Sequence, residues 1–341
     1  MNYFLLPQLY KENCLEYIDV IHDENVIENY NHSLNEYLNK IKEQIDLLDN
    51  IEDWDIYKKY TNPYEYIHTL IPNIKKTIST IRPISRAYYK LVEIINALNI
   101  NDFNKPINTF HLAEGPGGFV EAVCNIRSNA KDKYYAMTLL NNNPDVPGWN
   151  KSIQILNSFP NIYIEWGKDN TGDLFSLENI IYCKNKYNNT MDLITGDGGF
   201  DFSTDFNKQE TLGFNLIFAQ VCYAIAMQKT NGHFILKIYD SFTKPTIDIL
   251  YLLNTLYKKV YIMKPETSRY ANSEKYIVCK HFKNINSSDI FNKLIKNYFL
   301  IKTKPITNVL NNHKNSYFIN KIIEYNSIFG QQQIENISLT L

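Results

Sequence analysis

The chain has 341 residues, 44% of them hydrophobic, which is enough to bury at least one full-sized core. It has no run of about 18 consecutive apolar residues and no start typical of a signal peptide, so we expect neither a membrane-spanning helix nor a secretory leader. The net charge of −1 hides an asymmetry, because residues 1–60 carry 5 Lys and Arg against 13 Asp and Glu, a net of −8, which leaves +7 on the rest. A mildly basic body permits RNA binding, but an ordinary solvated surface explains it equally well.

Five cysteines are scattered along the chain without a Cys-x-x-Cys pair: Cys14, Cys124, Cys183, Cys222 and Cys279. Their odd number and spacing argue against a disulfide framework or a zinc site. We therefore expect reduced thiols that pack in the core of a cytoplasmic protein. The abundance of Asn, Ile, Lys and Tyr, which have AT-rich codons, suggests an AT-rich genome.

Residues 8–60 show apolar spacings of three and four, as in Leu38, Ile41 and Ile45, which predict amphipathic helices. Prolines then interrupt the chain, and a helical pattern runs over 85–98, with Ser85 as a plausible N-cap. Strands and helices alternate from there to about residue 282. The predicted strands are 107–113, 134–139, 161–166, 191–197, 232–239, 259–263 and 275–281. The predicted helices are 117–128, 149–157, 173–183, 208–228 and 245–256. The tail is rich in Asn and Lys and has helical patches such as 288–298.

This alternation predicts an α/β fold in which helices flank a seven-stranded, mostly parallel sheet. The pattern divides the chain into a helical N-terminal extension over 1–80, a central domain over 81–283 and a C-terminal helical extension over 284–341. The sequence shows no internal repeat.

Thr109 to Val123 has the pattern of a strand, a glycine turn and a helix. Glycines allow positive φ and a close approach of a ligand, and the following helix would point free N–H groups at the crevice. The turn is neither Gly-x-Gly-x-x-Gly nor a Walker A loop. Taken alone, it indicates a nucleotide-like ligand or a tight turn without one.

Within this turn, Glu114-Gly-Pro-Gly-Gly-Phe119 resembles the methionine-binding loop of the FtsJ-like RNA 2′-O-methyltransferases. The resemblance covers about residues 82–282 and rests on four motifs in the right order. It implies a Rossmann-like methyltransferase fold and S-adenosyl-L-methionine as cofactor. The cofactor contacts that it implies are Glu114, Gly115, Pro116, Gly117, Gly118, Phe119, Thr138, Asp173 and Asp197. For Asp173, which would accept from the adenine amine, a helix N-cap is an equally good interpretation.

The family catalyses with a Lys-Asp-Lys-Glu set, and Lys90, Asp197, Lys237 and Glu274 lie in the matching contexts. A ribose 2′-hydroxyl is a weak nucleophile, so it needs a base or a polarising cation. Lys237 acts as a base only if its pKa is lowered; otherwise positioning and electrostatics dominate. A lone Lys is usually a solvated charge and Asp197 could be a turn residue. Lys237, however, interrupts an apolar strand. Nothing in this chemistry needs a metal, and no ligand cluster suggests one.

One departure shifts the resemblance within the family. Where the ribosomal-RNA branch has an acidic residue after the second strand, this chain has Thr138. That feature, Asp145-Val-Pro-Gly-Trp-Asn150, and the continuous segment Lys264 to Glu274 are similar to the mRNA cap branch.

A capped substrate needs phosphate contacts and an aromatic platform for the methylated guanine. Arg82, Arg86 and Arg269 are candidates for the phosphates. Tyr89 and Trp149, with Tyr88 and Tyr270, are candidates for stacking, although such aromatics more often pack in cores.

The sequence therefore predicts a cap-specific mRNA 2′-O-methyltransferase that acts on the first transcribed nucleotide, converting cap 0 to cap 1. With the AT-rich composition, the cap-like branch suggests a large DNA virus that replicates in the cytoplasm. The alternatives are a ribosomal or transfer RNA 2′-O-methyltransferase and a non-catalytic RNA-binding subunit with this fold. A small-molecule methyltransferase is disfavoured, because such enzymes lack the lysine pair.

Overall fold

The structure is a computed structural model that describes residues 2–9, 14–48, 51–101, 103–140, 148–200, 206–311 and 315–341. Eight strands form a central sheet in the order β1-β8-β9-β7-β6-β3-β4-β5, and β10 and β2 form a second sheet. The strands are β1 (Asn2–Leu5), β2 (Ile18–His22), β3 (Asn108–Leu112), β4 (Lys133–Met137), β5 (Ile162–Ile164), β6 (Met191–Gly196), β7 (Gln228–Ile238), β8 (Tyr257–Lys264), β9 (Lys275–Phe282) and β10 (Ile306–Leu310).

Neighbouring strands of the central sheet are parallel from β5 through β4, β3 and β6 to β7. β9 runs antiparallel to both β7 and β8, and β1 runs antiparallel to β8. All six residues of β6 are buried, as expected for a parallel strand with both faces covered. The seven predicted strands and the α/β fold are confirmed. The eighth strand, β1, comes from the segment for which the sequence predicts helices only.

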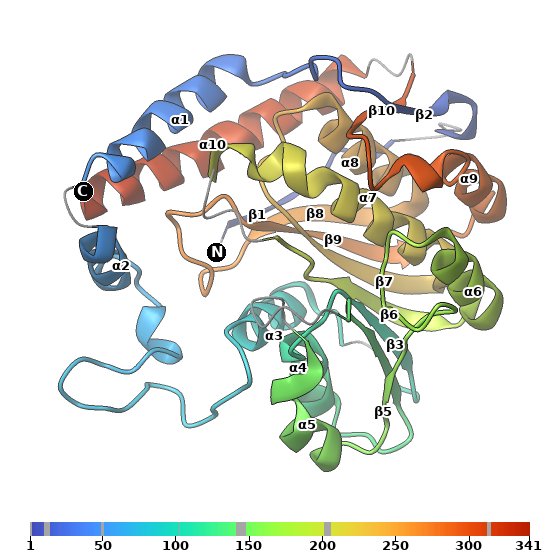
Figure 1. The fold of residues 1–341 in the computed structure, drawn as a ribbon, viewed down its shortest axis with the longest axis horizontal. Helices are drawn as coiled ribbons and strands as arrows, with labels where there is room; N and C mark the ends of the chain where they lie inside the picture. Colours follow the sequence, from blue (N-terminus) through green and yellow to red (C-terminus); the bar gives the residue numbers. More distant parts are fainter. Residues whose placement is uncertain are drawn as a thin grey trace.

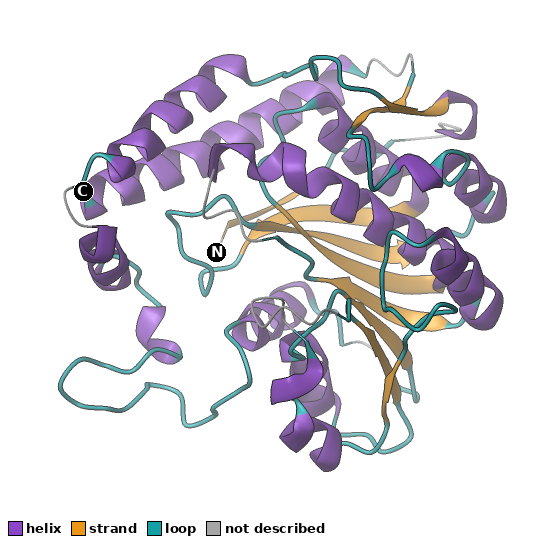
Figure 2. Ribbon diagram, in the orientation of Figure 1, coloured by secondary structure: helices purple, strands orange, loops and turns teal. Residues whose placement is uncertain are grey.

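Helices cover both faces of the central sheet (Figures 1 and 2). One hydrophobic core lies between the sheet and the helices α3 and α4, and a larger core lies between the sheet and the helices α6, α7, α8, α9 and α10. The helices are α1 (His32–Asp46), α2 (Ile51–Tyr60), α3 (Ala87–Leu98), α4 (Gly118–Arg127), α5 (Ile153–Ser158), α6 (Leu177–Tyr187), α7 (Gln209–Met227), α8 (Lys244–Leu256), α9 (Ser287–Leu294) and α10 (Ser316–Thr340). Short 3-10 turns are η1 (Cys14–Tyr17), η2 (Glu65–Ile67), η3 (Trp149–Lys151), η4 (Phe206–Lys208) and η5 (Tyr298–Leu300).

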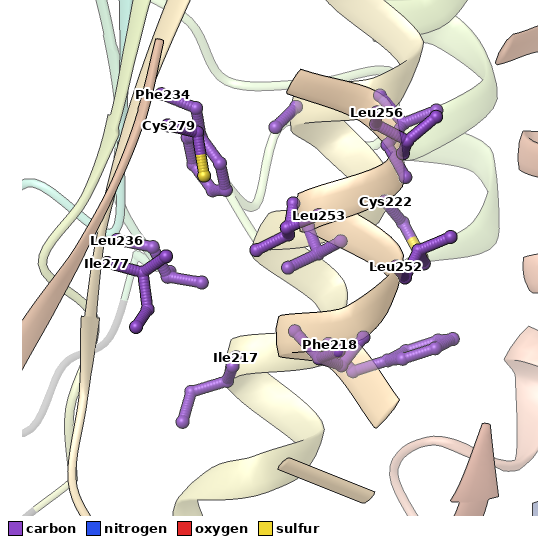
Figure 3. Close-up of a cluster of buried hydrophobic side chains, with 14 of the residues drawn as sticks. Ile217, Phe218, Cys222, Phe234, Leu236, Leu252, Leu253, Leu256, Ile277 and Cys279 are labelled. Atoms are coloured by element: carbon purple, nitrogen blue, oxygen red, sulfur yellow. The ribbon is translucent and has the colours of Figure 1, made fainter. Parts of the chain in front are cut away.

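The larger core lies between the sheet and the helices α7 and α8 (Figure 3). Alternation along β7 sends Phe234 and Leu236 to this core and Ile235 to the opposite one. By length and composition α7 could cross a membrane, but 78% of its apolar window is buried inside the protein, as in a core helix. All five cysteines are buried, which confirms their predicted packing role, and none of them forms a disulfide.

The N-terminal extension differs from the prediction. β1 pairs with β8, and β2 pairs with β10 of the C-terminal extension, so helices account for only part of residues 8–60. Buried residues of β2 alternate with exposed ones, but its partner strand lies more than 280 residues further on, so the local pattern alone does not reveal it. α1 packs along α10, which joins the two extensions a second time (Figure 1). The predicted domain boundaries themselves stay predictions.

Two predicted helix starts are also wrong. α3 begins at Ala87, and Ser85 does not cap it, because Arg86 occupies the cap position without a side-chain bond. The helix predicted over 173–183 is α6, which begins at Leu177 because the hydroxyl of Ser176 accepts from the N–H of Asn179. Asp173 is therefore free of the capping role that the sequence allowed.

We predict that Asp248→Ala detaches the C-terminal extension from the central domain. Oδ2 of this fully buried residue accepts from Val309 N at 3.0 Å, Leu310 N at 2.9 Å and Lys244 Nζ at 2.7 Å. The change removes the side-chain acceptor of the two backbone N–H groups and leaves Lys244 with Asn308 Oδ1 and the carbonyl oxygen of Leu310 only. It should lower the free energy of unfolding by about 3 kcal/mol in urea titration. Asp46→Ala, at an exposed carboxylate, should cost less than about 0.5 kcal/mol. Equal effects would contradict this prediction.

Candidate active site

A cavity of about 890 Å³ opens at the carboxyl ends of the parallel strands, the edge at which ligands bind in such sheets. Its wall contains Glu114 after β3, Thr138 after β4, Asp197 after β6 and Lys237 near the end of β7. Of the nine predicted cofactor residues, all but Gly117 line the cavity. The structure thus brings residues from five segments of the sequence to one site.

Two glycines of the wall leave no room for a side chain. A Cβ on Gly118 would lie 2.1 Å from Ser85 Oγ and 3.3 Å from the backbone nitrogen of Tyr88. Gly172 has φ of +65°, and a Cβ there would lie 1.9 Å from the carbonyl oxygen of Thr138. The first contact lets α3 approach the glycine loop, and the second holds the segment before Asp173 against the end of β4.

The buried carboxyl group of Glu114 turns back onto the helix that follows it. Its Oε1 accepts from the N–H groups of Phe119 at 2.7 Å and Val120 at 2.8 Å. The expectation of free N–H groups facing the crevice is therefore wrong, since Glu114 caps the first turn of α4. Burial raises the pKa of Glu114 to about 8, with the charge of Asp197 adding to the effect, while the two N–H groups oppose it.

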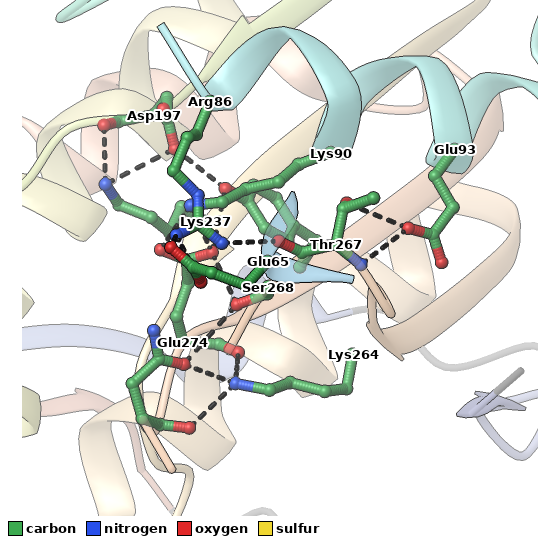
Figure 4. Close-up of polar contacts among 12 residues, drawn as sticks. Glu65, Arg86, Lys90, Glu93, Asp197, Lys237, Lys264, Thr267, Ser268 and Glu274 are labelled. Atoms are coloured by element: carbon green, nitrogen blue, oxygen red, sulfur yellow. Dashed lines mark hydrogen bonds and ion pairs between the residues drawn. The ribbon is translucent and has the colours of Figure 1, made fainter. Parts of the chain in front are cut away.

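The four predicted catalytic residues lie together as two ion pairs (Figure 4). Lys90 Nζ lies 2.7 Å from Glu274 Oε1. Lys237 Nζ lies 3.3 Å from Asp197 Oδ1 and donates to the carbonyl oxygen of Asp197 at 2.8 Å. Their side chains are only 13–17% exposed, so each charge is largely desolvated and depends on its partner.

Tyr276 joins the two pairs. Its hydroxyl donates to Asp197 Oδ1 at 3.0 Å and lies 3.4 Å from Glu274 Oε1. The hydroxyl of Ser268 donates to the same Glu274 oxygen at 2.9 Å. Tyr276 was not among the predicted site residues, although it follows Glu274 by two residues and alternation along a strand places such residues on one face.

The charges within the cluster decide its protonation. Burial alone would lower the pKa of Lys237, but the charges of Asp197, Tyr239 and Glu274 outweigh burial and raise it. Burial alone would raise the pKa of Glu274, but Lys90, Lys237 and Lys264 outweigh burial and lower it. At neutral pH the protein's own groups therefore keep Lys237 as an ammonium and Glu274 as a carboxylate. A neutral lysine base is not what this environment provides.

Hydrogen bonds hold both ends of the loop from Lys264 to Glu274 in place. Lys264 Nζ donates to the carbonyl oxygens of Asn272 at 2.7 Å and of Glu274 at 2.8 Å. Glu93 of α3 accepts from the N–H groups of Glu266 at 2.7 Å and Thr267 at 3.0 Å. α3, which carries Lys90, is thereby fastened to the loop that ends in Glu274.

Thr138, which takes the place of the acidic residue expected in the ribosomal-RNA branch, is buried in the wall of the cavity. Asp173 also lines the cavity; it accepts from the N–H of Phe175 at 2.8 Å and forms an ion pair with Lys302 Nζ at 2.5 Å. Oδ2 of Asp173 is thus bound by a lysine of the C-terminal extension, a contact that was not predicted from the sequence.

The predicted RNA contacts lie in different settings. Arg86 and Arg269 both bind Glu65, and Arg86 lines the cavity. Arg82 is exposed, and Tyr89 donates its hydroxyl to the carbonyl oxygen of Ile81 at 2.7 Å. Their roles in RNA binding stay predictions.

The aromatic candidates differ in the same way. Tyr88 is buried in the core and Tyr270 is half-buried. Trp149 packs beside the glycine loop, where its Cζ3 lies 3.7 Å from the position of a Cβ on Gly117. Residues 145–147 of the cap-like segment lie outside the described residues.

Comparisons with known proteins agree with this geometry. A family model described as FtsJ-like methyltransferase matches residues 83–282. The chain is 27% identical over 263 residues to the cap-specific mRNA (nucleoside-2′-O-)-methyltransferase 2 of Drosophila melanogaster, covering 73% of this chain and 36% of the relative. It is 33% identical over 208 residues to the cap-specific mRNA (nucleoside-2′-O-)-methyltransferase 1 of Trypanosoma brucei brucei, covering 58% of this chain and 55% of the relative. The chain thus spans between a third and somewhat over half of the length of these relatives.

Among solved structures, a ribosomal RNA methyltransferase from Plasmodium falciparum superposes with a TM-score of 0.41 at 21% identity, covering 58% of this chain and 97% of that one.

We predict that Gly118→Ala destabilises the contact between α3 and the glycine loop. The new methyl group would overlap Ser85 Oγ, and the backbone of Tyr88 leaves it little room to shift. Thermal or urea unfolding should show a loss of about 1–3 kcal/mol. Gly148→Ala is the matched control, because no heavy atom lies within 4 Å of a Cβ there. A Gly118→Ala protein as stable as the control would show that the contact is not tight.

Proposed function

Since the chain belongs to the FtsJ-like methyltransferase family, we propose that it transfers a methyl group from S-adenosylmethionine to a ribose 2′-hydroxyl of capped mRNA, at the first transcribed nucleotide. The observation that carries the proposal is the double ion pair of Lys90 with Glu274 and Lys237 with Asp197 beside one cavity. The two curated relatives are both named for cap-specific 2′-O-methylation, which supports a capped substrate.

The residues of the cavity fit the proposed cofactor. Ser85 Oγ is buried in the wall without a hydrogen-bond partner among the described residues, so a polar ligand group would satisfy it. Asp173 offers a carboxylate that suits the amine of adenine, and Thr138 offers a hydroxyl that suits a ribose. S-adenosylmethionine supplies an electrophilic methyl group on a sulfonium.

Lys237 contacts the nucleophile in this proposal. An ammonium has three N–H donors, and Asp197 engages Lys237 through a carbonyl oxygen and a carboxylate, so a donor remains for the 2′-oxygen. Because the pKa of Lys237 is raised, the group first acts as a cation that orients the hydroxyl. Lys237 Nζ takes the hydroxyl proton only in the fraction of molecules in which it is neutral.

The pair of Lys90 and Glu274 sets the charge around Lys237. The carboxylate of Glu274 raises the pKa of Lys237, while Lys90 and Lys237 together lower the pKa of Glu274. Lys90 thus keeps Glu274 ionised, and Tyr276 fixes the separation of the two carboxylates. Their role is positioning and electrostatic balance.

The RNA chain itself would be bound by the basic side chains around the cavity. Arg82, Arg86 and Arg269 are the proposed phosphate contacts, with Tyr89 and Trp149 as the proposed aromatic contacts. The same proposal places the enzyme in a reducing cytoplasm, which agrees with its five buried cysteines, none of which forms a disulfide.

We expect Lys237→Ala to lower kcat by about 10²-fold or more, because it removes the group that orients the 2′-oxygen. The measurement is transfer of a labelled methyl group from S-adenosylmethionine to capped, uncapped and ribosomal-type RNA. Lys259→Ala is the control, since that lysine is exposed on β8, which β9 separates from β7 in the sheet. Transfer to uncapped RNA at the same rate as to capped RNA would contradict the proposal of a capped substrate. Undiminished activity of Lys237→Ala would contradict the proposed role of Lys237.

Asp197→Asn should shift the acid limb of the pH–rate profile to lower pH. Asp197 raises the pKa of Lys237, so removal of its charge lowers that pKa, and the neutral amine appears at lower pH. The rate at the optimum should nevertheless fall, because the orienting contact is lost. Glu274→Gln should shift the limb in the same direction. A limb that stays in place or moves to higher pH in both variants would exclude Lys237 as the titrating group.

A further inference from the structure

A buried carboxylate of the N-terminal extension, Glu65, binds two arginines beside the cavity, and Figure 4 shows it with one of them, Arg86. Glu65 lies in η2, before the residues that the family model matches, and none of its surface is exposed. Arg86 Nη1 donates to both of its oxygens at 2.9 Å, and Arg269 donates through Nε at 2.9 Å and Nη2 at 2.8 Å. Glu65 was not among the residues predicted from the sequence.

The remaining contacts of Glu65 come from its own segment. Asn62 Nδ2 donates to it at 2.8 Å and Thr69 Oγ1 at 2.7 Å. Burial alone would raise the pKa of Glu65, but the bonds from Arg269, Thr69 and Asn62 and the charge of Arg86 outweigh burial and lower it. A buried carboxylate with this many donors is ionised and held in one position.

The two arginines belong to the segments that carry the catalytic residues. Arg86 lies one turn before Lys90, at the start of α3, and Arg269 lies in the loop that ends in Glu274. Arg86 Nη2 also donates to the carbonyl oxygen of Thr267 at 3.2 Å, in the same loop. Their side chains are 23% and 29% exposed, and Arg86 lines the cavity.

The group has donors to spare. A guanidinium has five N–H groups, and the bonds to Glu65 and Thr267 use at most three on Arg86 and two on Arg269. Two arginines and one carboxylate also leave one net positive charge beside the catalytic residues. Planar guanidinium groups with free N–H edges match the geometry of a phosphate.

We propose that Glu65 is a positioning residue for RNA binding, which holds Arg86 and Arg269 so that their remaining N–H groups bind a phosphate next to the target ribose. The inference rests on the proposed function, because it assigns the phosphate to the RNA substrate. Positioning by Glu65 and charge alone predict opposite effects of removing the Glu65 charge on RNA affinity. If only charge mattered, loss of the Glu65 charge would raise the positive potential and strengthen RNA binding.

The test is Glu65→Gln, in which a single acceptor oxygen cannot hold two guanidinium groups. The probe is a short capped RNA labelled with a fluorophore, and its Kd is measured by anisotropy at several salt concentrations. We expect the Kd and the KM for RNA to rise about tenfold, with kcat within about twofold of the wild type. The slope of log Kd against log salt should become shallower by about 0.7 or more, as for loss of one phosphate contact on a single strand.

Glu36→Gln removes an equal charge from an exposed carboxylate of the same extension and should leave the Kd unchanged. Equal or tighter RNA binding by Glu65→Gln would overturn the inference. So would a fall in kcat at unchanged KM, because Glu65 would then act on the pair of Lys90 and Glu274.

Arg269→Lys decides the matter if Glu65→Gln no longer binds S-adenosylmethionine or unfolds. It keeps the charge but loses the fork to Glu65, so a raised Kd supports the inference and a wild-type Kd overturns it. The proposed function fails separately, if the wild-type protein binds this RNA but transfers no methyl group to it.

Discussion

Mutual neutralisation of two lysines and two carboxylates in a largely buried site is the interaction on which this structure depends. Lys90 and Glu274 form one pair and Lys237 and Asp197 the other, and each side chain is only 13–17% exposed. Loss of one partner would leave an uncompensated charge, at a cost of about 3–5 kcal/mol. The four residues come from α3, the end of β6, β7 and the loop before β9, so the whole sheet edge must form before the charges can pair.

Both extensions support the loop that ends in Glu274. Glu65 of the N-terminal extension binds Arg269, and Gln333 of α10 donates to the carbonyl oxygen of Ala271 at 3.0 Å. The extensions are also joined to each other by β2 with β10 and by α1 with α10. Residues outside the family match therefore act on the position of residues within it, which gives a physical reason for a methyltransferase domain to carry such extensions.

Local patterns predicted the parallel strands of the central sheet, and the resemblance to the FtsJ-like family singled out the four residues of the two ion pairs. The second half of β7 contains the apolar run Phe234 to Leu236, and Lys237 is conspicuous as the charge that follows it. The sequence did not predict β1 and β2, whose partners lie some 250 residues or more away, or the bond from Glu65 to Arg269 across 204 residues. Nor did the sequence predict that Glu114 caps α4, because the turn of a carboxylate onto its own helix depends on loop geometry. Long-range pairing and side-chain direction are what local patterns do not encode.

The position of the transferred methyl group tests the central claim most directly. A capped RNA is incubated with the protein and S-adenosylmethionine, digested to nucleosides and cap dinucleotides, and analysed by mass spectrometry. The account predicts one added methyl group on the ribose of the first transcribed nucleotide, because the cluster around Lys237 is built to orient a hydroxyl oxygen. A methyl group on a base, or on an internal ribose irrespective of the cap, would contradict it.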